Sequence, residues 1–480
     1  MKKIISLVLV LAAVVLFSCT ATGKKYDIEI TSPVQSDSLY LGRYYLGNVR
    51  IVDSTRFVKG EAHFKGDLKQ GIYVLALPDG NYVDLLVGDK KSIKVNLDTA
   101  NMPYNVKFEK GSEQEAFYNY SMEYFEMKRR FREIGGLAMA DTSAEAHAKL
   151  EAEAKSIVES QKHKVDSLRA KYPGKMISVF VGGMDVPEPE PFEVPENCTN
   201  PDSLQRAYYY AFFRDHFFDN IDLSDERSYY TPYIGQRLES YFNRVLVQTY
   251  DSIVPQAVKL FEISAANDSA ARIMASYLVY YTTRFDIPGF FEERKVMGLD
   301  NIMVELANRY YQTDKAIKAD STIAKKVIEK ANKIRNCMVG DTARNIPVVT
   351  LDGEYHRLYD FSGSDYTIFV LYEPDCDHCK VRLPKVAEFC KIPPLQGRVK
   401  GVALCMTDDK EKMERFISER NTANLINVWD PERISEYWNK YDTSETPMIV
   451  VIDKDHRIVA RNIEPEQLFQ WITLDDLLKQ

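Results

Sequence analysis

Two cysteines separated by two residues are the part of this chain best suited to chemistry: Cys376 and Cys379, with Asp377 and His378 between them. The apolar run 366–372 before them predicts a β-strand, and the amphipathic run from Lys380 predicts a helix. We therefore expect both sulfur atoms at a helix N-terminus, where free backbone N–H groups and the helix dipole stabilise a thiolate. Since the thiolate is the attacking species, this pattern predicts disulfide chemistry.

Two prolines make the interpretation more specific. Pro384 stands five residues after Cys379, and Pro447 follows Thr446 directly before the apolar run Met448–Asp453, where a Thr-Pro pair suits a cis peptide. This strand, dithiol, helix and distal Thr-Pro strand resemble the thioredoxin fold, an α/β fold with a mixed central sheet. Its lead-in, Met338-Val-Gly-Asp and 346–361, is similar to that of the TlpA/ResA-like and AhpC/TSA-like branch. We assign residues 337–480 to this domain.

The resemblance implies roles for individual residues. Cys376 would be the exposed attacking thiolate and Cys379 the resolving thiol. The backbone beside Pro447 would hold a client strand, with Thr446 flanking that groove. A protonated His378 would stabilise the thiolate, while Asp377 would oppose it. The implied activity is thiol:disulfide oxidoreduction on client proteins. Because similar proteins tend to act as reductases, the resemblance favours a reductase. Such an enzyme would need an electron-donating or electron-accepting partner in the envelope.

The chain departs from the family pattern around the dithiol. Relatives often carry a tryptophan before the first cysteine, and a buried acid six residues before it or three after the second. Asp375, Val370 and Arg382 occupy these positions here. The proton acceptor for Cys379 is therefore unassigned, with Glu373 or a water as candidates, and the redox direction stays open.

The dithiol and the class of the protein also admit other interpretations. A zinc site usually needs further closely spaced Cys or His ligands, and c-type haem attachment needs a histidine where Lys380 stands, so we expect no metal or cofactor. A peroxiredoxin-like antioxidant enzyme is an alternative, although its Pro-x-x-x-Thr-x-x-Cys motif is absent around Cys376. A binding lipoprotein with an accessory thioredoxin domain is the other alternative, with its tyrosine-rich helices as the working part.

The start of the chain predicts its location. Residues 1–18 combine a basic start, an apolar run from Ile4 to Phe17 and a small Ser18, as in a lipoprotein signal peptide. We expect Cys19 to become the lipidated N-terminus, with 19–25 as a tether, so that the protein is anchored in a bacterial envelope membrane and faces the periplasm. The net charge of −8 over 480 residues argues against a nucleic-acid partner.

Between tether and dithiol the hydrophobic period changes. Residues 26–108 alternate in short runs, including 72–77, 82–87 and 92–97, which predicts a small antiparallel β-sandwich. Residues 109–336 predict an all-helical domain with a proline-rich break at 185–201. Expected helices include one from Ser112, with Phe117, Tyr120, Tyr124, Met127 and Phe131 on one face, and two others at 238–260 and 270–281. The whole is a multidomain α+β protein.

Four further cysteines are predicted to lie outside the chemistry. Cys390 and Cys405 fall on apolar positions and are expected to be buried free thiols. Cys198 and Cys337 either form a structural disulfide, or Cys198 is a regulatory thiol in a loop. Connectivity does not follow from the sequence.

Overall fold

The computed structural model describes residues 25–33, 38–141, 143–195, 198–283 and 296–478. The predicted signal segment 1–18 and Cys19 lie outside these residues. The chain forms two compact units: the first holds residues up to Val186 together with Arg227–Gln236, and the second holds Pro187–Glu226 and everything from Arg237. The helical stretch is thus divided between the two units.

The β-domain of the first unit consists of two four-stranded sheets. One has the order β4-β1-β7-β8, with β1 Tyr26–Thr31, β4 Glu61–Gly66, β7 Ser92–Leu97 and β8 Val106–Phe108. The other has the order β3-β2-β5-β6, with β2 Leu39–Tyr45, β3 Asn48–Thr55, β5 Gly71–Ala76 and β6 Tyr82–Val87. Inward-facing residues of both sheets, such as Ile28, Leu41 and Leu85, form one core. The predicted sandwich is confirmed.

One strand pair differs from the antiparallel arrangement expected from the sequence. β1 and β7 run parallel, with Ile28 opposite Ile93. The short alternating runs of the sequence predict antiparallel neighbours throughout. Sixty residues, 32–91, separate the two strands, however, and so long a connection permits a parallel pair.

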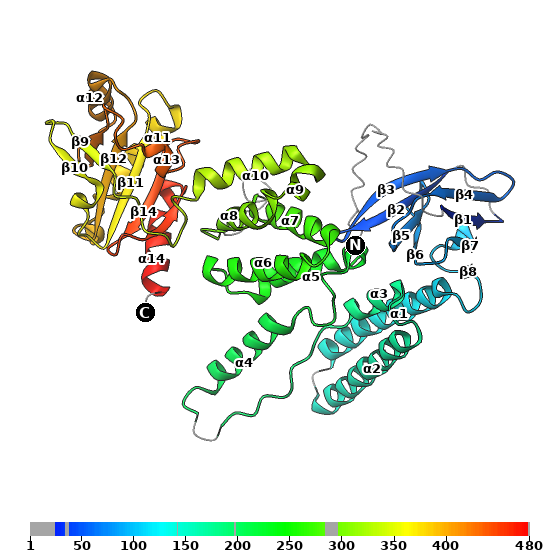
Figure 1. Ribbon diagram of the computed structural model, residues 1–480. Coiled ribbons are helices and arrows are strands. Elements are labelled where there is room, and N and C mark those ends of the chain that lie inside the picture. The colour runs from blue at the N-terminus through cyan, green and yellow to red at the C-terminus, as the bar shows by residue number, and fades with distance from the viewer. Residues whose placement is uncertain (1–24, 34–37, 142, 196–197, 284–295, 479–480) are drawn as a thin grey trace. The chain divides into compact units, whose positions relative to one another are not determined.

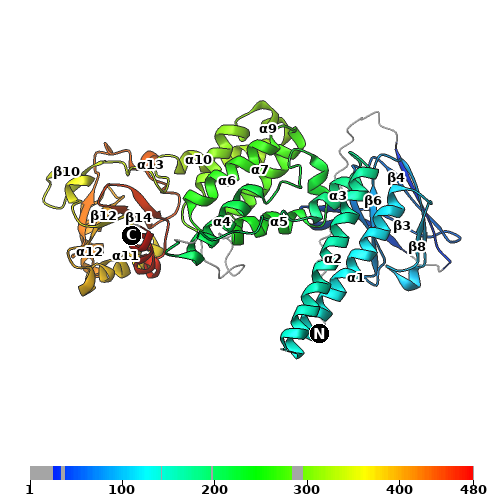
Figure 2. The ribbon, with the colours of Figure 1, turned by 90° about the horizontal axis from the view of Figure 1, so that it is seen from below.

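Three helices cover the outer face of the second sheet. They are α1 Glu113–Ala140, α2 Ala144–Lys171 and α3 Met176–Met184, and Figures 1 and 2 show α1 and α2 side by side. The Ser112 hydroxyl accepts a hydrogen bond from the Glu115 N–H and caps α1 as expected. Phe117 and Tyr120 of the predicted apolar face are buried against Ile72 and Leu86 of the sheet.

The second unit begins with helices. They are α4 Pro201–His216, α6 Tyr250–Ser264, α7 Asp268–Thr283, α8 Asn301–Leu306, α9 Asp314–Ala319 and α10 Ser321–Ile334, while α5 Ile234–Ser240 joins the two units. As predicted, the proline-rich stretch 185–195 forms neither helix nor strand, and 270–281 lies within α7.

The prediction of one helix over 238–260 is wrong. A π-helical turn at Tyr241–Val245 ends the first part, and Leu246 is extended before α6 begins after Thr249. The Gln248 side chain donates hydrogen bonds of 2.9 and 2.8 Å to the carbonyl oxygens of Phe242 and Leu246. These bonds satisfy groups that the interrupted helix leaves free.

The C-terminal part of the second unit is a seven-stranded mixed sheet flanked by helices (Figure 1). Its order is β10-β9-β13-β12-β11-β14-β15, with β9 Pro347–Thr350, β10 Tyr355–Arg357, β11 Tyr366–Tyr372, β12 Val399–Cys405, β13 Ile426–Trp429, β14 Met448–Asp453 and β15 Ile458–Arg461. The helices are α11 Asp377–Phe389, α12 Lys410–Glu419, α13 Tyr437–Lys440 and α14 Leu468–Leu478. The predicted strands 366–372 and 448–453 are confirmed, and the sheet has the expected thioredoxin fold. None of the helices among the described residues combines the length and apolarity needed to span a bilayer.

Candidate active site

The dithiol sits where a central strand meets a helix. Every residue of β11 is buried, which makes the strand a rigid base. α11 begins at Asp377, so that Cys376 is its N-cap residue, and the Cys376 Sγ accepts a 3.4 Å hydrogen bond from the Cys379 N–H. The sulfur thus occupies the position of the usual N-cap oxygen and lies at the positive end of the helix dipole.

The two thiols differ in exposure and acidity. Cys376 is partly exposed and Cys379 is fully buried, and both are free. Burial alone would raise the pKa of Cys376, but hydrogen bonds from Thr446, from Cys379 and from the His378 backbone outweigh it and lower that pKa. Burial raises the pKa of Cys379 to about 12. Cys376 is therefore the more accessible and the more acidic of the two thiols.

The Thr446–Pro447 turn lies against the exposed sulfur. The peptide bond between these residues is cis. The Cys376 thiol donates a 3.3 Å hydrogen bond to the Thr446 carbonyl oxygen. This proximity follows from the sheet, because β11 and β14 are antiparallel neighbours with Leu371 opposite Met448. The end of one strand therefore meets the start of the other.

The acidic residues beside the dithiol are neutralised by lysines. Lys380 forms a 2.8 Å ion pair with Asp377, and Lys412 of α12 forms another with Asp375. The expected opposition of Asp377 to the thiolate is thus reduced. The His378 side chain is exposed and makes no hydrogen bond or ion pair with any described residue, while its backbone N–H faces the Cys376 sulfur.

The positions considered for the proton acceptor of Cys379 lie in different environments. Glu373 contacts the Cys379 sulfur through its backbone, while its side chain is exposed. Val370 is buried in β11. Arg382, which occupies the position of the family's acid, forms a 2.6 Å ion pair with Glu464. Sequence reasoning missed Lys412 and Glu464, since both reach the site from distant segments without a local signal.

The other four cysteines are also free, so the considered Cys198–Cys337 disulfide is not formed. Cys337 is buried in the core of the C-terminal sheet, where burial raises its pKa to about 11, whereas Cys198 follows the proline-rich stretch. Burial also raises the pKa of Cys390, to about 12, and that of Cys405. No group of three His, Cys, Asp or Glu side chains able to hold a metal occurs in the part of the chain that the structure describes.

Comparison with known proteins agrees with this geometry. A family model described as thioredoxin-like matches residues 363–458. The C-terminal domain is thioredoxin-like. No curated protein matches the chain. This match leaves the regions upstream of the thioredoxin-like domain unassigned.

Several solved structures resemble parts of the chain. A domain of a possible thiol-disulfide isomerase from Cytophaga hutchinsonii is 26% identical, over 30% of this chain and 96% of that chain, with a TM-score of 0.28. A thioredoxin-like protein from Bacteroides caccae is 13% identical, over 60% and 99%, with a TM-score of 0.41. The thioredoxin domain of a thiol-disulfide oxidoreductase from Bacteroides vulgatus is 19% identical, over 29% and 96%, with a TM-score of 0.26.

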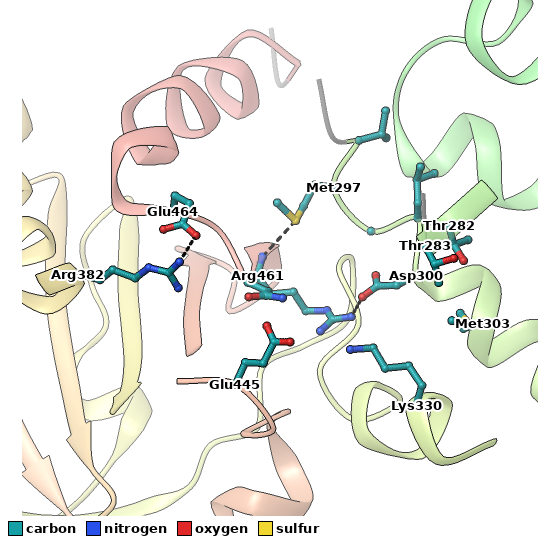
Figure 3. A pocket seen from close by; sticks show the side chains of 14 residues that line it. Thr282, Thr283, Met297, Asp300, Met303, Lys330, Arg382, Glu445, Arg461 and Glu464 are labelled. Carbon is teal, nitrogen blue, oxygen red and sulfur yellow. Dashed lines mark hydrogen bonds and ion pairs between the residues drawn. The ribbon is translucent and has the colours of Figure 1, made fainter. Parts of the chain in front are cut away.

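A polar cavity of about 460 Å³ lies where the thioredoxin-like domain meets the helices before it (Figure 3). Glu445, next to Thr446, and Arg382 of the dithiol helix both line it. Arg461 of β15 is only 3% exposed and donates to the Asp300 carboxylate at the start of α8. Burial lowers the pKa of Arg461 to about 10. This buried ion pair ties the thioredoxin-like domain to the helical segment.

Proposed function

We propose that this protein is a thiol:disulfide oxidoreductase that exchanges disulfides with client proteins through Cys376 and Cys379. The observation that carries the proposal is the asymmetry of the dithiol. One sulfur is accessible and has a lowered pKa, and the other is buried and has a raised pKa. A difference in exposure and pKa serves no purpose in structural cysteines. It is what an attacking thiol and a resolving thiol require.

In the reducing direction, the Cys376 thiolate attacks one sulfur of a client disulfide. A mixed disulfide forms, and the other client sulfur leaves as a thiolate and takes a proton. Cys379 then gives up its proton and attacks the Cys376 sulfur, which releases the second client thiolate. The product is a Cys376–Cys379 disulfide, and two electrons have passed to the client. We assign Thr446 and Pro447 to the client groove, and His378 to stabilising the thiolate when protonated.

The sequence supports an envelope location for this activity. We propose that residues 1–18 are removed and that Cys19 carries a lipid, so that the dithiol faces the periplasm. Disulfides persist in such an oxidising space. A reductase there needs an electron donor to return the Cys376–Cys379 disulfide to the dithiol. We propose that this donor is an envelope protein.

Turnover tests the proposal directly. The chain without residues 1–19 should reduce insulin disulfides in the presence of a small-molecule thiol. Cys376→Ser should abolish this rate, because no other sulfur in the site ionises readily. Cys390→Ser provides the matched control, since this thiol lies at the far end of the same helix, and it should keep the full rate. Equal rates for the parent chain and Cys376→Ser would reject the enzyme.

Trapping identifies the clients. Cys379→Ser cannot resolve the mixed disulfide at Cys376, so it should accumulate covalent adducts in the envelope. Adducts with one or a few partners indicate a dedicated reductase, and adducts with many secreted proteins indicate a broad exchanger. The absence of adducts, where a matched thioredoxin control forms them, would favour a binding protein with an accessory thioredoxin-like domain.

A further inference from the structure

A second cavity, of about 350 Å³, lies within the first unit and shares no residue with the dithiol site. Edge strand β6, helix α1 and the loop before β8 form its walls. The residues that line it are Gly80, Asn81, Tyr82, Val83, Asp84, Met102, Pro103, Tyr104, Tyr118, Ser121, Met122 and Phe125. None of them belongs to the thioredoxin-like domain, so the cavity requires its own explanation.

Aromatic rings form much of the cavity wall. Tyr82, Tyr104 and Phe125 come from the three separate elements, and each exposes nearly half of its surface, at 46%, 47% and 47%. Tyr118 is held in place because its hydroxyl donates to the Pro103 carbonyl oxygen at 3.1 Å and accepts from the Val106 N–H at 3.4 Å. Large rings left exposed around a cavity are typical of binding surfaces.

A carboxylate without a cation lies in this aromatic wall. Alternation along β6 places Asp84 on the same face as Tyr82, which is the face turned toward α1. The only partner of its carboxylate among the described residues is the neutral Tyr44 hydroxyl, at 3.3 Å. No described Lys or Arg pairs with it. Burial raises the pKa of Asp84 to about 6, which reflects the cost of holding this charge uncompensated.

A second polar group in the cavity lacks a hydrogen-bond partner among the described residues. The Ser121 Oγ, on the α1 side, is buried and has no hydrogen-bond partner within the described residues. Buried polar atoms are usually satisfied, so an unpaired hydroxyl and a carboxylate without a cation in one cavity point to a ligand that supplies a donor and a positive charge.

We propose that this cavity binds an alkylammonium group, either a lysine side chain of a polypeptide or a free primary amine. The ammonium donates to Asp84 and Ser121, and the aliphatic stem lies along the aromatic rings, which also attract a cation through their faces. A neutral ligand would leave the Asp84 charge uncompensated. The site is independent of the redox chemistry.

Calorimetry on the chain without residues 1–19 tests the site with three probes. N-acetyl-lysine methylamide and n-pentylamine carry the ammonium, and N-acetyl-norleucine methylamide has a similar stem without it. We expect both amines to bind at least about tenfold more tightly than the norleucine probe, since one charged hydrogen bond contributes roughly that factor. Tighter binding of the lysine derivative than of pentylamine indicates a polypeptide source, and the reverse indicates a free amine.

Variants connect the binding to the cavity. Asp84→Asn should weaken amine binding about tenfold or more, while Asp67→Asn, at an exposed position of the same unit, should leave it unchanged. Phe125→Ala provides an independent variant at an exposed ring and should also weaken binding. Equal affinities of the amines and the norleucine probe would overturn the proposal. Full amine affinity in Asp84→Asn would do the same.

Discussion

The Cys376 thiol and the Thr446 carbonyl oxygen lie 3.3 Å apart, although 70 positions separate the two residues in the chain. The Thr446 hydroxyl also forms a hydrogen bond that lowers the pKa of Cys376. Thr446 therefore acts on the sulfur in two ways. Its carbonyl accepts from the thiol, and its hydroxyl stabilises the thiolate.

The first prediction concerns this hydroxyl. Thr446→Val keeps the shape of the side chain and removes the donor, so the pKa of Cys376 should rise. Because fewer thiolates are then present at pH 7, alkylation of Cys376 should slow about two- to tenfold, the effect of one hydrogen bond. The pH profile of iodoacetamide labelling measures this. Thr446→Ser retains the hydroxyl and should restore the parent profile, whereas slowing in both variants would show that the loss is one of packing.

The order of alkylation is the second prediction. In the fully reduced chain, iodoacetamide should modify Cys376 before any other cysteine, and the rate should increase as the pH rises through the lowered pKa of this thiol. Cys379, with a pKa raised to about 12, should follow only when the chain unfolds or at high pH. Mass spectrometry of the labelled peptides gives the order directly. Earlier labelling of Cys379 would contradict our assignment of the attacking sulfur.

The buried pair of Arg461 and Asp300 leads to the third prediction. Asp300→Asn leaves the guanidinium, which is 3% exposed, without its counter-charge. We expect the free energy of unfolding to fall by about 1–3 kcal/mol. All three tryptophans of the chain, at 429, 438 and 471, lie in the thioredoxin-like domain, so their fluorescence in urea reports on this domain.

The control for Asp300 is another helical aspartate. Asp268 pairs with Lys315 at the surface, where both side chains are 73% exposed. Asp268→Asn should change the stability by less than about 0.5 kcal/mol. Equal effects of the two substitutions would mean that the Arg461 pair does not stabilise the domain.

The fourth prediction concerns pH and Asp84. The pKa of this carboxyl is about 6 in the folded chain, against an ordinary value of 3.8. The folded state therefore binds more protons between these values, so the stability of the first unit should fall as the pH rises from 4 to 6. Tyr44 and Tyr82, which face Asp84, have raised pKa values and stay protonated throughout this range.

Asp84→Asn removes this cost. The variant should be more stable than the parent by about 3 kcal/mol at pH 7 and should gain less than about 1 kcal/mol at pH 4. Hydrogen–deuterium exchange of peptides that cover β5 and β6, compared between variant and parent at each pH, measures the difference. A gain that is equal at both pH values would indicate a packing effect rather than a charge effect.

The sequence predicted those parts of the molecule that depend on neighbouring residues. The strand at 366–372, the helix from Ser112 and the break at 185–195 follow from hydrophobic period, capping and proline, and all three are present. The juxtaposition of Cys376 with Thr446 was expected only through the family resemblance. Hydrophobic period alone does not reveal which strands become neighbours.

Other features depend on distant segments and had no local signal. Asp300 and Arg461 are 161 positions apart, and Asp375 and Lys412 are 37 apart. The helix expected over 238–260 failed for a related reason, since a hydrophobic period shows where a face is apolar but not where the backbone turns within it. In the sequence, Asp84 cannot be distinguished from any other polar strand residue. Only the packing of α1 beside β6 places its carboxylate in a cavity.

The antiparallel pairing of β11 with β14 has a consequence for how this domain can change in evolution. The pairing of Leu371 with Met448 sets the distance between the Cys376 sulfur and the Thr446–Pro447 turn. The length of the connection through β12, α12 and β13 does not set this distance. Insertions or deletions in the exposed loops of that connection should be tolerated without loss of the site. A shift of β14 by a single residue would turn its side chains to the opposite face and move Thr446 away from Cys376. Strand register, rather than loop length, is therefore the constraint on this site.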